Sequence, residues 1–317
     1  MNSSSNPEQR TPGLREASGQ RALVVRIGAL GDVLLTRRLT FSLSRAGFRS
    51  TLLAPARHAS LLLHDCWIEA VLDSESPRFA EAFAGGWPEE GGAFDLAVVI
   101  SRSASLVDAA RLAAARIIVV SPEPERSDRS IAQQWVAALN AECEPFPGLL
   151  PRLAVADRAL RVKRATLIHP GSGSPRKNWP IERFRELSLE LLTLGHAVVW
   201  IRGPAESGEV VPPAGVECLD HPSLPSLART LAAARLFIGN DSGVSHLAAA
   251  VGAPTVALFG PTSSEIWAPD GERVRVVRSP TPAMADLLLE DVRTVAAARC
   301  AVRYPGAADG RVRSQAS

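Results

Sequence analysis

A single aspartate follows the first buried strand of the sequence and precedes a helical pattern. The segment Arg26-Ile-Gly-Ala-Leu-Gly-Asp32 joins the two, at the edge where open α/β sheets bind ligands. Gly28 and Gly31 allow the backbone to approach a ligand closely. The carboxylate of Asp32 would project into any cleft at this edge and is therefore a candidate functional group, although one carboxylate does not identify a reaction. An aspartate at the start of a helix is also a common cap, so both roles stay open.

A loop of small residues later in the chain carries two cations. It reads His-Pro-Gly-Ser-Gly-Ser-Pro-Arg-Lys-Asn-Trp-Pro from His169 to Pro180. Its free backbone N–H groups would point at anionic oxygens, with Arg176 and Lys177 beside them. A diphosphate is therefore the ligand that this loop is expected to bind. A P-loop would have glycine before the lysine, and this departure argues against ATP hydrolysis. An ordinary basic surface loop is the alternative.

The third segment, Phe237–Gly252, runs from a strand through a polar turn into a helix of small residues. Asp241 is suited to binding sugar hydroxyls, while Ser242, Gly243 and the free N–H groups of the first helical turn favour a phosphate. His246 follows one turn later. Because Ser242 directly precedes Gly243, the Gly-x-Ser-x-Gly elbow of serine hydrolases is absent. The alternative is a capped helix with a histidine in the core.

These segments are carried by short β-branched runs that alternate with longer helical stretches, which predicts parallel βαβ units. Leu35, Leu39 and Leu43 recur at helical spacing, and Gly47 stands where a left-handed cap is needed. The predicted strands are Ala22–Ile27, Ser50–Ala54, Ala70–Leu72, Leu96–Ile100, Ile117–Val120, Ala165–His169, Ala197–Ile201, Leu236–Gly239 and Thr255–Phe259.

The stretch Cys143–Pro151, with three prolines and a glycine, stops both helix and strand. It predicts a linker between a first domain at 21–150 and a second at 151–300. Residues 1–20 are expected to be a disordered tail and residues 301–317 a mobile one. Residues 283–300 are predicted as a final amphipathic helix, for which a return to the first domain is left open.

Composition narrows the possible partners. A net charge of +2 is too small for a nucleic-acid-binding face, and the four cysteines lack both the spacing of metal sites and the density of a disulfide scaffold. We expect no metal, a reducing cytoplasm and no bilayer-spanning segment. Neither glycine turn completes the G-x-G-x-x-G pattern of dehydrogenases.

The three motifs GALGD, HPGSGSPRKNWP and GNDSGVSHLAAAVGAPTVALFGPT together resemble the family-nine glycosyltransferases, best known for ADP-heptose:lipopolysaccharide heptosyltransferases. The likeness runs from about Arg21 to the final helix. It implies a GT-B-like architecture: two facing Rossmann-like domains with parallel sheets and an interdomain cleft. The resemblance further implies that domain 21–150 binds the acceptor and domain 151–300 the nucleotide sugar.

The resemblance assigns roles residue by residue. Asp32 matches the family's catalytic base and Lys177 its catalytic lysine at the donor phosphates. Donor-binding roles are implied for Ser172, Glu206, Asp241, Ser242, Gly243 and His246, and backbone roles in loops for Gly28, Gly31, Gly171 and Gly173. Departures at Ala29, Ser172 and Gly173, where relatives often have serine or threonines, weaken the substrate assignment more than the fold.

The implied function is inverting transfer of a heptose or related sugar from an ADP-sugar, a substrate rather than a cofactor, to a lipopolysaccharide-core or similar glycan. Two alternatives stay open: another nucleotide sugar, or a nucleotide-sugar-binding protein without catalysis. The expected partners are the donor and a glycolipid or oligosaccharide acceptor, with peripheral contact at the inner face of the cytoplasmic membrane. Arg57, Arg102 and Arg129 could hold anionic groups of the acceptor, although solvated surface arginines are the simpler interpretation.

Overall fold

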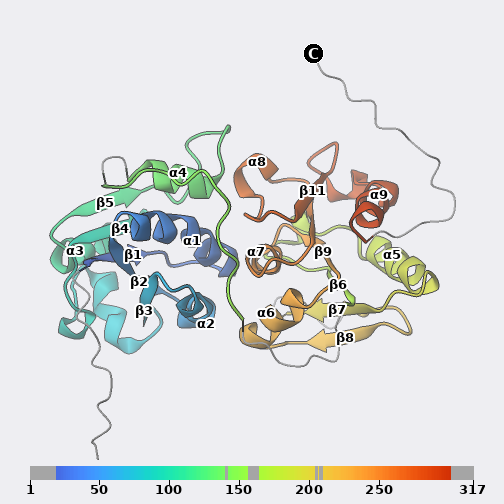
Figure 1. Cartoon of the computed structure of the whole chain (residues 1–317), viewed down its shortest axis with the longest axis horizontal. Coiled ribbons are helices and arrows are strands. Elements are labelled where there is room, and N and C mark those ends of the chain that lie inside the picture. Colours follow the sequence, from blue (N-terminus) through green and yellow to red (C-terminus); the bar gives the residue numbers. More distant parts are fainter. Residues whose placement is uncertain (1–18, 140–141, 156–163, 204–205, 207–209, 301–317) are drawn as a thin grey trace, which may run out of the picture.

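A computed structural model describes residues 19–139, 142–155, 164–203, 206 and 210–300 of the chain. It contains two α/β lobes, each built on a parallel sheet (Figure 1). The expected tail at 301–317 lies outside the described residues, as does most of the tail at 1–20. Gln20 does not belong to a tail, because it begins the first strand.

The first sheet has the strand order β3-β2-β1-β4-β5, and every pairing in it is parallel. This order matches the first five strands of the doubly wound Rossmann order 3-2-1-4-5-6. Its strands are β1 (Gln20–Val25), β2 (Phe48–Ala54), β3 (Ile68–Asp73), β4 (Leu96–Ile100) and β5 (Ile117–Val120). Its helices are α1 (Leu30–Arg45), α2 (Ala56–Ala59), α3 (Ala104–Ala113) and α4 (Ile131–Ala137).

Helix α1 forms where the leucine spacing predicted it. Leu35, Leu39 and Leu43 are buried against the sheet, and Gly47 adopts φ +90° just beyond the last turn, a conformation that glycine reaches without strain. The amide of Gly47 donates to the carbonyl of Ser44. The apolar stripe therefore fixes α1 on the sheet, and the glycine turns the chain into β2.

The second sheet has the order β11-β10-β9-β6-β7-β8, again all parallel. Its strands are β6 (Thr166–His169), β7 (Val198–Arg202), β8 (Glu217–Asp220), β9 (Leu236–Asn240), β10 (Thr255–Phe259) and β11 (Val274–Arg278). Its helices are α5 (Ile181–Thr193), α6 (Leu224–Ala232), α7 (Gly243–Ala250), α8 (Ser264–Trp267) and α9 (Leu289–Cys300).

The last helix stays with the second lobe. Helix α9 packs against α5 and the strands β9, β10 and β11. Val292 and Ala296 belong to the same buried cluster as Trp200 and Leu258 of that lobe. A return of this helix to the first domain is therefore wrong for the described residues, because its apolar positions are already buried in the second core.

The two lobes meet along α1 and α7, with residues 142–155 running between them (Figure 1). A single apolar cluster extends from Leu34 of α1 to Leu247 of α7. Arg37 forms a buried ion pair with Asp65 and donates to the carbonyl of Pro151 at 2.8 Å. This interface between the lobes, called the seam below, is therefore both apolar and hydrogen-bonded. It sets how the carboxyl edges of the two sheets face each other.

Candidate active site

The first lobe presents Asp32 in the first turn of α1. One carboxylate oxygen accepts the Ala29 amide at 3.1 Å, and the other forms an ion pair with Arg26 at 2.5 Å. The capping role left open by the sequence is thus present. About a quarter of the side chain, 27 %, remains exposed, and a carboxylate oxygen can accept more than one hydrogen bond. Asp32 is therefore held in place yet accessible, and its role as a base stays a prediction.

Arg26, which sequence reasoning passed over as a strand residue, orients this carboxylate. It stands just after β1, and its guanidinium lies 5.4 Å from the ring centroid of Trp135 on α4. A cation over an indole face is attracted to the ring. The ring and the aspartate together hold the arginine, and the arginine in turn limits the rotation of the Asp32 carboxylate.

His58 of α2 is a second residue that sequence reasoning missed here. Its Nδ1 lies 3.1 Å from the carbonyl oxygen of Gly28. Burial lowers the pKa of His58 and the neighbouring Arg57 adds to this, while the Gly28 carbonyl and Asp32 act in the opposite direction. The histidine thus stands within the electrostatic range of the Asp32 carboxylate. Nothing in its sequence surroundings signals this position.

The second lobe presents Lys177 and Asp241 as a pair. The Lys177 amine donates to Oδ2 of Asp241 at 2.8 Å, and the Thr262 hydroxyl donates to the same oxygen at 2.7 Å. The aspartate side chain is 7 % exposed and the lysine side chain 31 %. A buried carboxylate therefore fixes the amine of a partly exposed lysine, and such an amine has further hydrogens to donate to a phosphate.

Ser242 is the N-cap of α7, and its hydroxyl accepts the Ser245 amide at 3.5 Å. The capping alternative for this serine is therefore correct. Gly243 opens the helix, so its first-turn amides lie next to Asp241. These amides and the helix dipole still favour an anion at this point.

The small-residue loop folds over a buried glutamate. Glu206 accepts the Gly203 amide, and its Oε1 lies 3.6 Å from Nε2 of His169. Burial raises the pKa of Glu206, but the interaction with His169 and the Gly203 hydrogen bond outweigh burial and hold it below its ordinary value. A Cβ on Gly171 would collide with this carboxylate. The Gly171 position therefore requires glycine because the glutamate packs directly on the loop.

Two further loop residues differ in how much freedom they have. The Ser172 hydroxyl lies 2.6 Å from Oδ1 of Asn178 and 2.8 Å from the Ser174 carbonyl oxygen, and its single hydrogen can be donated to either acceptor. A Cβ on Gly173 would meet nothing within 4 Å. The hydroxyl of Ser172 is thus used within the loop, whereas the Gly173 backbone is open to a ligand.

Asn240 fixes this loop to the sheet, and sequence reasoning did not identify it. Its amide donates to the Pro170 carbonyl at 2.6 Å, and its Oδ1 accepts the Trp179 amide at 3.0 Å. The side chain is fully buried. Because Asn240 ends β9 and directly precedes Asp241, one short segment sets the position of both the aspartate and the loop that carries Lys177.

The candidate residues of the two lobes converge where α1 meets α7. A Cβ on Gly31 would lie 3.2 Å from Cδ2 of His246. Burial lowers the pKa of His246; Asp241 and then Asp32 oppose the shift, and Lys177 adds to it. The imidazole therefore stands within the fields of candidate residues from both lobes. Gly31 permits this close approach of loop and helix, whereas a Cβ on Gly28 would collide with the Asp32 side chain.

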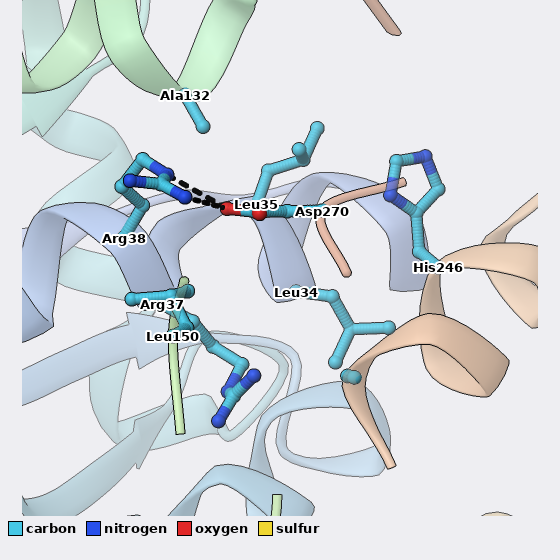
Figure 2. A pocket seen from close by; sticks show the side chains of 9 residues that line it. Leu34, Leu35, Arg37, Arg38, Ala132, Leu150, His246 and Asp270 are labelled. Atoms are coloured by element: carbon cyan, nitrogen blue, oxygen red, sulfur yellow. Dashed lines mark hydrogen bonds and ion pairs between the residues drawn. The ribbon is translucent and has the colours of Figure 1, made fainter. Parts of the chain in front are cut away.

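Beside this junction the seam is nearly closed. Figure 2 shows His246 near the ion pair between Arg38 of α1 and Asp270 of the second lobe. The cavity that they border measures about 20 Å³, which has room for roughly one water molecule. The seam itself is thus a packed interface rather than a sugar site.

The arginines considered for the acceptor have mixed surroundings. Arg57 pairs with Glu75 and Arg102 with Glu123, both on the exposed surface. Arg129 borders a hollow of about 360 Å³. The ion pairs of Arg57 with Glu75 and of Arg102 with Glu123 agree with the simpler interpretation, that these two are solvated surface arginines. An acceptor role for any of the three arginines stays a prediction.

Within the described residues, no cluster of three or more His, Cys, Asp or Glu side chains could hold a metal ion. The expectation that no metal is needed stays a prediction. Among the same residues, no helix has the length and apolar character to cross a bilayer.

Comparison with known proteins decides the family of the second lobe. The sequence model for Glycosyltransferase family 9 (heptosyltransferase) matches residues 139–294. The C-terminal half of this chain belongs to glycosyltransferase family 9. The curated relatives agree: lipopolysaccharide heptosyltransferase 2 of Salmonella typhimurium is 31 % identical over 160 residues, which cover 42 % of this chain and 44 % of that protein.

A second curated relative is lipopolysaccharide heptosyltransferase 1 of Pseudomonas aeruginosa, 39 % identical over 92 residues, or 27 % of this chain and 26 % of that protein. The matched part thus spans less than half the length of these relatives.

Solved structures extend the likeness to the fold of both lobes. A family 9 glycosyltransferase from Veillonella parvula superimposes with a TM-score of 0.74 at 19 % identity, covering 89 % of this chain and 97 % of that one. An E. coli heptosyltransferase with ADP gives 0.72 at 20 % identity, covering 88 % and 100 %. The fold is GT-B-like, as the resemblance implied.

Proposed function

We propose that this chain is an inverting glycosyltransferase that moves a heptose or closely related sugar from an ADP-sugar to a lipopolysaccharide-core or similar glycan. The observation that carries the proposal is the meeting of the first turns of α1 and α7, which places Asp32 and the Lys177–Asp241 pair around one buried histidine, His246. Family membership of the second lobe and the names of its relatives support the choice of donor.

In this mechanism Asp32 accepts the proton of the acceptor hydroxyl while that oxygen attacks the anomeric carbon, opposite the departing diphosphate. The hydroxyl becomes acidic as the new C–O bond forms, so a correctly placed carboxylate is sufficient. The placement is provided by Arg26 on one carboxylate oxygen and the Ala29 amide on the other. No covalent sugar intermediate is required.

The leaving diphosphate is stabilised from the second lobe. Lys177 supplies a positive charge: 31 % of its side chain is exposed, and Asp241 holds its amine in place. The first-turn amides of α7 supply fixed donors for the phosphate oxygens. Such a preformed set of donors stabilises the negative charge that develops on the leaving group.

The acceptor class and the cellular location follow from the same proposal. The first lobe would bind a glycolipid or oligosaccharide at the inner face of the cytoplasmic membrane, with peripheral contact only. No cofactor and no nucleic acid take part, because the donor is consumed as a substrate. The names of the two curated relatives described above, both lipopolysaccharide heptosyltransferases, support this acceptor class.

A donor screen with Asp32→Asn tests the proposal. ADP-heptose, ADP-glucose and UDP-glucose are supplied with a lipopolysaccharide-core acceptor, and release of the nucleoside diphosphate is measured. The asparagine preserves shape and loses basicity, so turnover should fall by about 10²-fold or more, while ADP affinity changes little because the donor groups lie on the other lobe. Asp108→Asn, an exposed aspartate on α3 paired with Arg111, serves as the matched control.

Each result has a defined meaning. Comparable turnover in Asp32→Asn and wild type would remove Asp32 from the role of base. Faster release from UDP-glucose than from ADP-heptose would favour another nucleotide sugar. Tight donor binding without release from any donor would favour the non-catalytic binding protein.

A further inference from the structure

The peptide unit between Gly28 and Ala29 lies against the carboxylate of Asp32. Its N–H, which belongs to Ala29, donates to Oδ2 of Asp32 at 3.1 Å. Its carbonyl oxygen, which belongs to Gly28, lies 3.1 Å from Nδ1 of His58 on α2. The same group of atoms therefore contacts the candidate base at one end and a histidine from a different element at the other.

The geometry of a peptide unit couples these two contacts. The unit is planar, and in its trans form the C=O and the N–H point in opposite directions. The unit between Gly28 and Ala29 is trans, so a contact that fixes the direction of the carbonyl also fixes the direction of the N–H. Hydrogen bonds at both ends of one unit also polarise it, which strengthens each of them.

The contact with Gly28 determines which nitrogen of His58 carries the hydrogen. A carbonyl oxygen accepts hydrogen bonds and cannot donate them, so Nδ1 must be the donor. Burial lowers the pKa of His58 from its ordinary value of 6.5, so the neutral ring, with its one hydrogen at Nδ1, predominates at pH 7. Within the described part of the chain Nε2 has no partner, and it is not one of the buried unpaired atoms, so it reaches solvent.

The helix that carries the histidine is itself fixed to the sheet. The amide of Ala56, its first residue, donates to the carboxylate of Asp73 at the end of β3 at 2.9 Å. Ala59 is completely buried, and the amides of His58 and Ala59 donate to the carbonyl of Pro55. His58 is therefore a firm support from which the loop after β1 can be held.

The turn that carries Asp32 is built from residues that hold their own conformation weakly. Ala29 is the N-cap of α1 and has no side-chain oxygen for the amides of the first turn. Glycine at position 28 adopts many backbone conformations, yet a Cβ there would lie 2.8 Å from Oδ2 of Asp32. The position thus requires glycine, and the hydrogen bond from His58 supplies the rigidity that a glycine lacks.

We propose that His58 is a positioning residue for the base: it locks the peptide unit between Gly28 and Ala29 so that the Ala29 N–H stays directed at Asp32. The proposal rests on the proposed function, because it concerns the base of the same reaction. With the unit locked, one carboxylate oxygen is held by Ala29 and the other by Arg26. Without His58 the unit is free to rotate at the glycine, and the carboxylate loses one of these two contacts.

Three substitutions of His58 test the lock in the full chain. The side-chain nitrogen of asparagine takes the place of Nδ1 and that of glutamine the place of Nε2, whereas phenylalanine keeps a ring and has neither nitrogen. Turnover is measured with ADP-heptose and a lipopolysaccharide-core acceptor. We expect His58→Gln and His58→Phe to lower kcat by about tenfold or more, because misplaced reacting groups slow the reaction steeply, and His58→Asn to keep most of the wild-type kcat. The Kd for ADP should stay unchanged in all three, since the donor groups lie on the other lobe.

Exchange of the Ala29 amide hydrogen with solvent tests the lock without any substrate. The amide is protected while it is bonded to Asp32, and local opening exposes it. Water-exchange NMR of the ¹⁵N-labelled chain should show exchange about tenfold faster in His58→Phe than in wild type, and close to the wild-type rate in His58→Asn. The imidazole ¹⁵N shifts of wild type should place the hydrogen of His58 at Nδ1.

The matched control is His64→Gln, an exposed position in the 3₁₀ turn Ser60–His64 that follows α2. It should leave kcat and amide exchange unchanged, and thermal unfolding confirms that all variants fold. Wild-type kcat and wild-type exchange in His58→Phe would overturn the lock. A higher kcat in His58→Gln than in His58→Asn would also overturn it, because the effect would then belong to Nε2 and a direct contact with the acceptor.

The two readouts separate this inference from the proposed function. If wild type releases no nucleoside diphosphate from any donor, the proposed function fails, while exchange of the Ala29 amide still decides whether His58 locks the peptide unit. If wild type transfers sugar and the three variants match it in kcat and in exchange, the lock alone fails and the proposed function stands.

Discussion

At the scale of single residues, His246 joins the chemistry of the two lobes to the stability of the chain. It is 8 % exposed, and burial lowers its pKa from the ordinary value of 6.5 despite the opposing charges of Asp241 and Asp32. The unfolded chain therefore binds a proton at this histidine at a higher pH than the folded chain does. Folding stability must rise with pH across the interval between the two pKa values.

Replacing His246 should therefore flatten the acid side of the stability curve. The wild-type free energy of unfolding should fall as the pH drops below about 6.5, with a contribution from this residue of up to ~1.4 kcal/mol per pH unit. His246→Gln lacks that contribution. Urea unfolding at several pH values between 5 and 8 measures the difference between the two slopes.

The control is His64→Gln, at an exposed position, which should keep the wild-type slope. The pKa values of His58 and His196 are also lowered by burial, but both residues are present in every variant, so their contributions cancel. Parallel curves for His246→Gln and wild type would show that the imidazole takes up its proton equally well in the folded chain.

The site residues that could be predicted from the sequence are those whose type and position after a strand indicate a function. Asp32, Lys177 and Asp241 each follow a buried strand, and such places are recognisable from periodicity. Arg26 and Thr262 could not be predicted in this way, because each matters through the contact that it makes with an aspartate, Asp32 or Asp241. The partner of Thr262 is 21 residues away, and no local pattern reports that distance in space.

At the scale of elements, the segment that begins with β9 and leads into α7 organises the second lobe. Asn240 ends the strand, and its side chain donates to the Pro170 carbonyl and accepts the Trp179 amide. Ser242 caps the helix that follows. The loop with Lys177 is thus positioned from β9 rather than by its own sequence. Asn240 acts as a positioning residue.

Asn240→Ala should therefore destabilise the second lobe and loosen the loop. The variant leaves a buried amide and a buried carbonyl without their side-chain partner, which costs roughly 1–3 kcal/mol for each group. Urea unfolding measures the stability loss. Titration with ADP should show weaker binding under conditions where the variant is still fully folded.

Asn178→Ala is the comparison for this loop, because Asn178 is partly exposed and its side chain accepts only the Ser172 hydroxyl. Its stability loss should be the smaller of the two. If Asn240→Ala unfolded at the same urea concentration as Asn178→Ala, Asn240 would not be the residue that holds the loop on the sheet.

Most elements could be predicted from the sequence, and the two strands that were missed lie at the edges of the second sheet. Strand β8 reads Glu-Cys-Leu-Asp and β11 reads Val-Arg-Val-Val-Arg. Edge strands are buried on fewer sides, so they tolerate charged side chains between their apolar ones. The apolar runs that predicted the central strands are therefore absent where the sheet meets solvent.

At the scale of the whole molecule, the orientation of the lobes depends on how closely α1 and α7 approach. Arg38 of α1 pairs with Asp270 (Figure 2). The same guanidinium also donates to the carbonyls of Phe146 and Gly148. These contacts lie near one end of the seam. At the other end, a Cβ on Gly243 would stand 2.9 Å from the Leu30 Cβ and 3.0 Å from the Gly31 amide nitrogen.

Gly243→Ala should therefore separate the lobes without unfolding either of them. Alanine is the better helix former, so α7 itself is not weakened, but backbone atoms of the first lobe must move to accept the methyl group. A misplacement of about 1 Å between reacting groups can cost roughly 10²-fold in rate. We expect kcat for sugar transfer to fall at least tenfold on the same grounds.

Binding of ADP distinguishes this geometric effect from a damaged donor site. The donor cradle belongs to the second lobe alone, so the Kd for ADP in Gly243→Ala should stay close to that of wild type. Gly19→Ala is the control, since its Cβ would meet its nearest neighbour at 3.4 Å, an ordinary contact. A parallel loss of ADP affinity and kcat would mean that Gly243 serves the phosphate site rather than the spacing of the lobes, and unchanged kcat would mean that the spacing tolerates a methyl group.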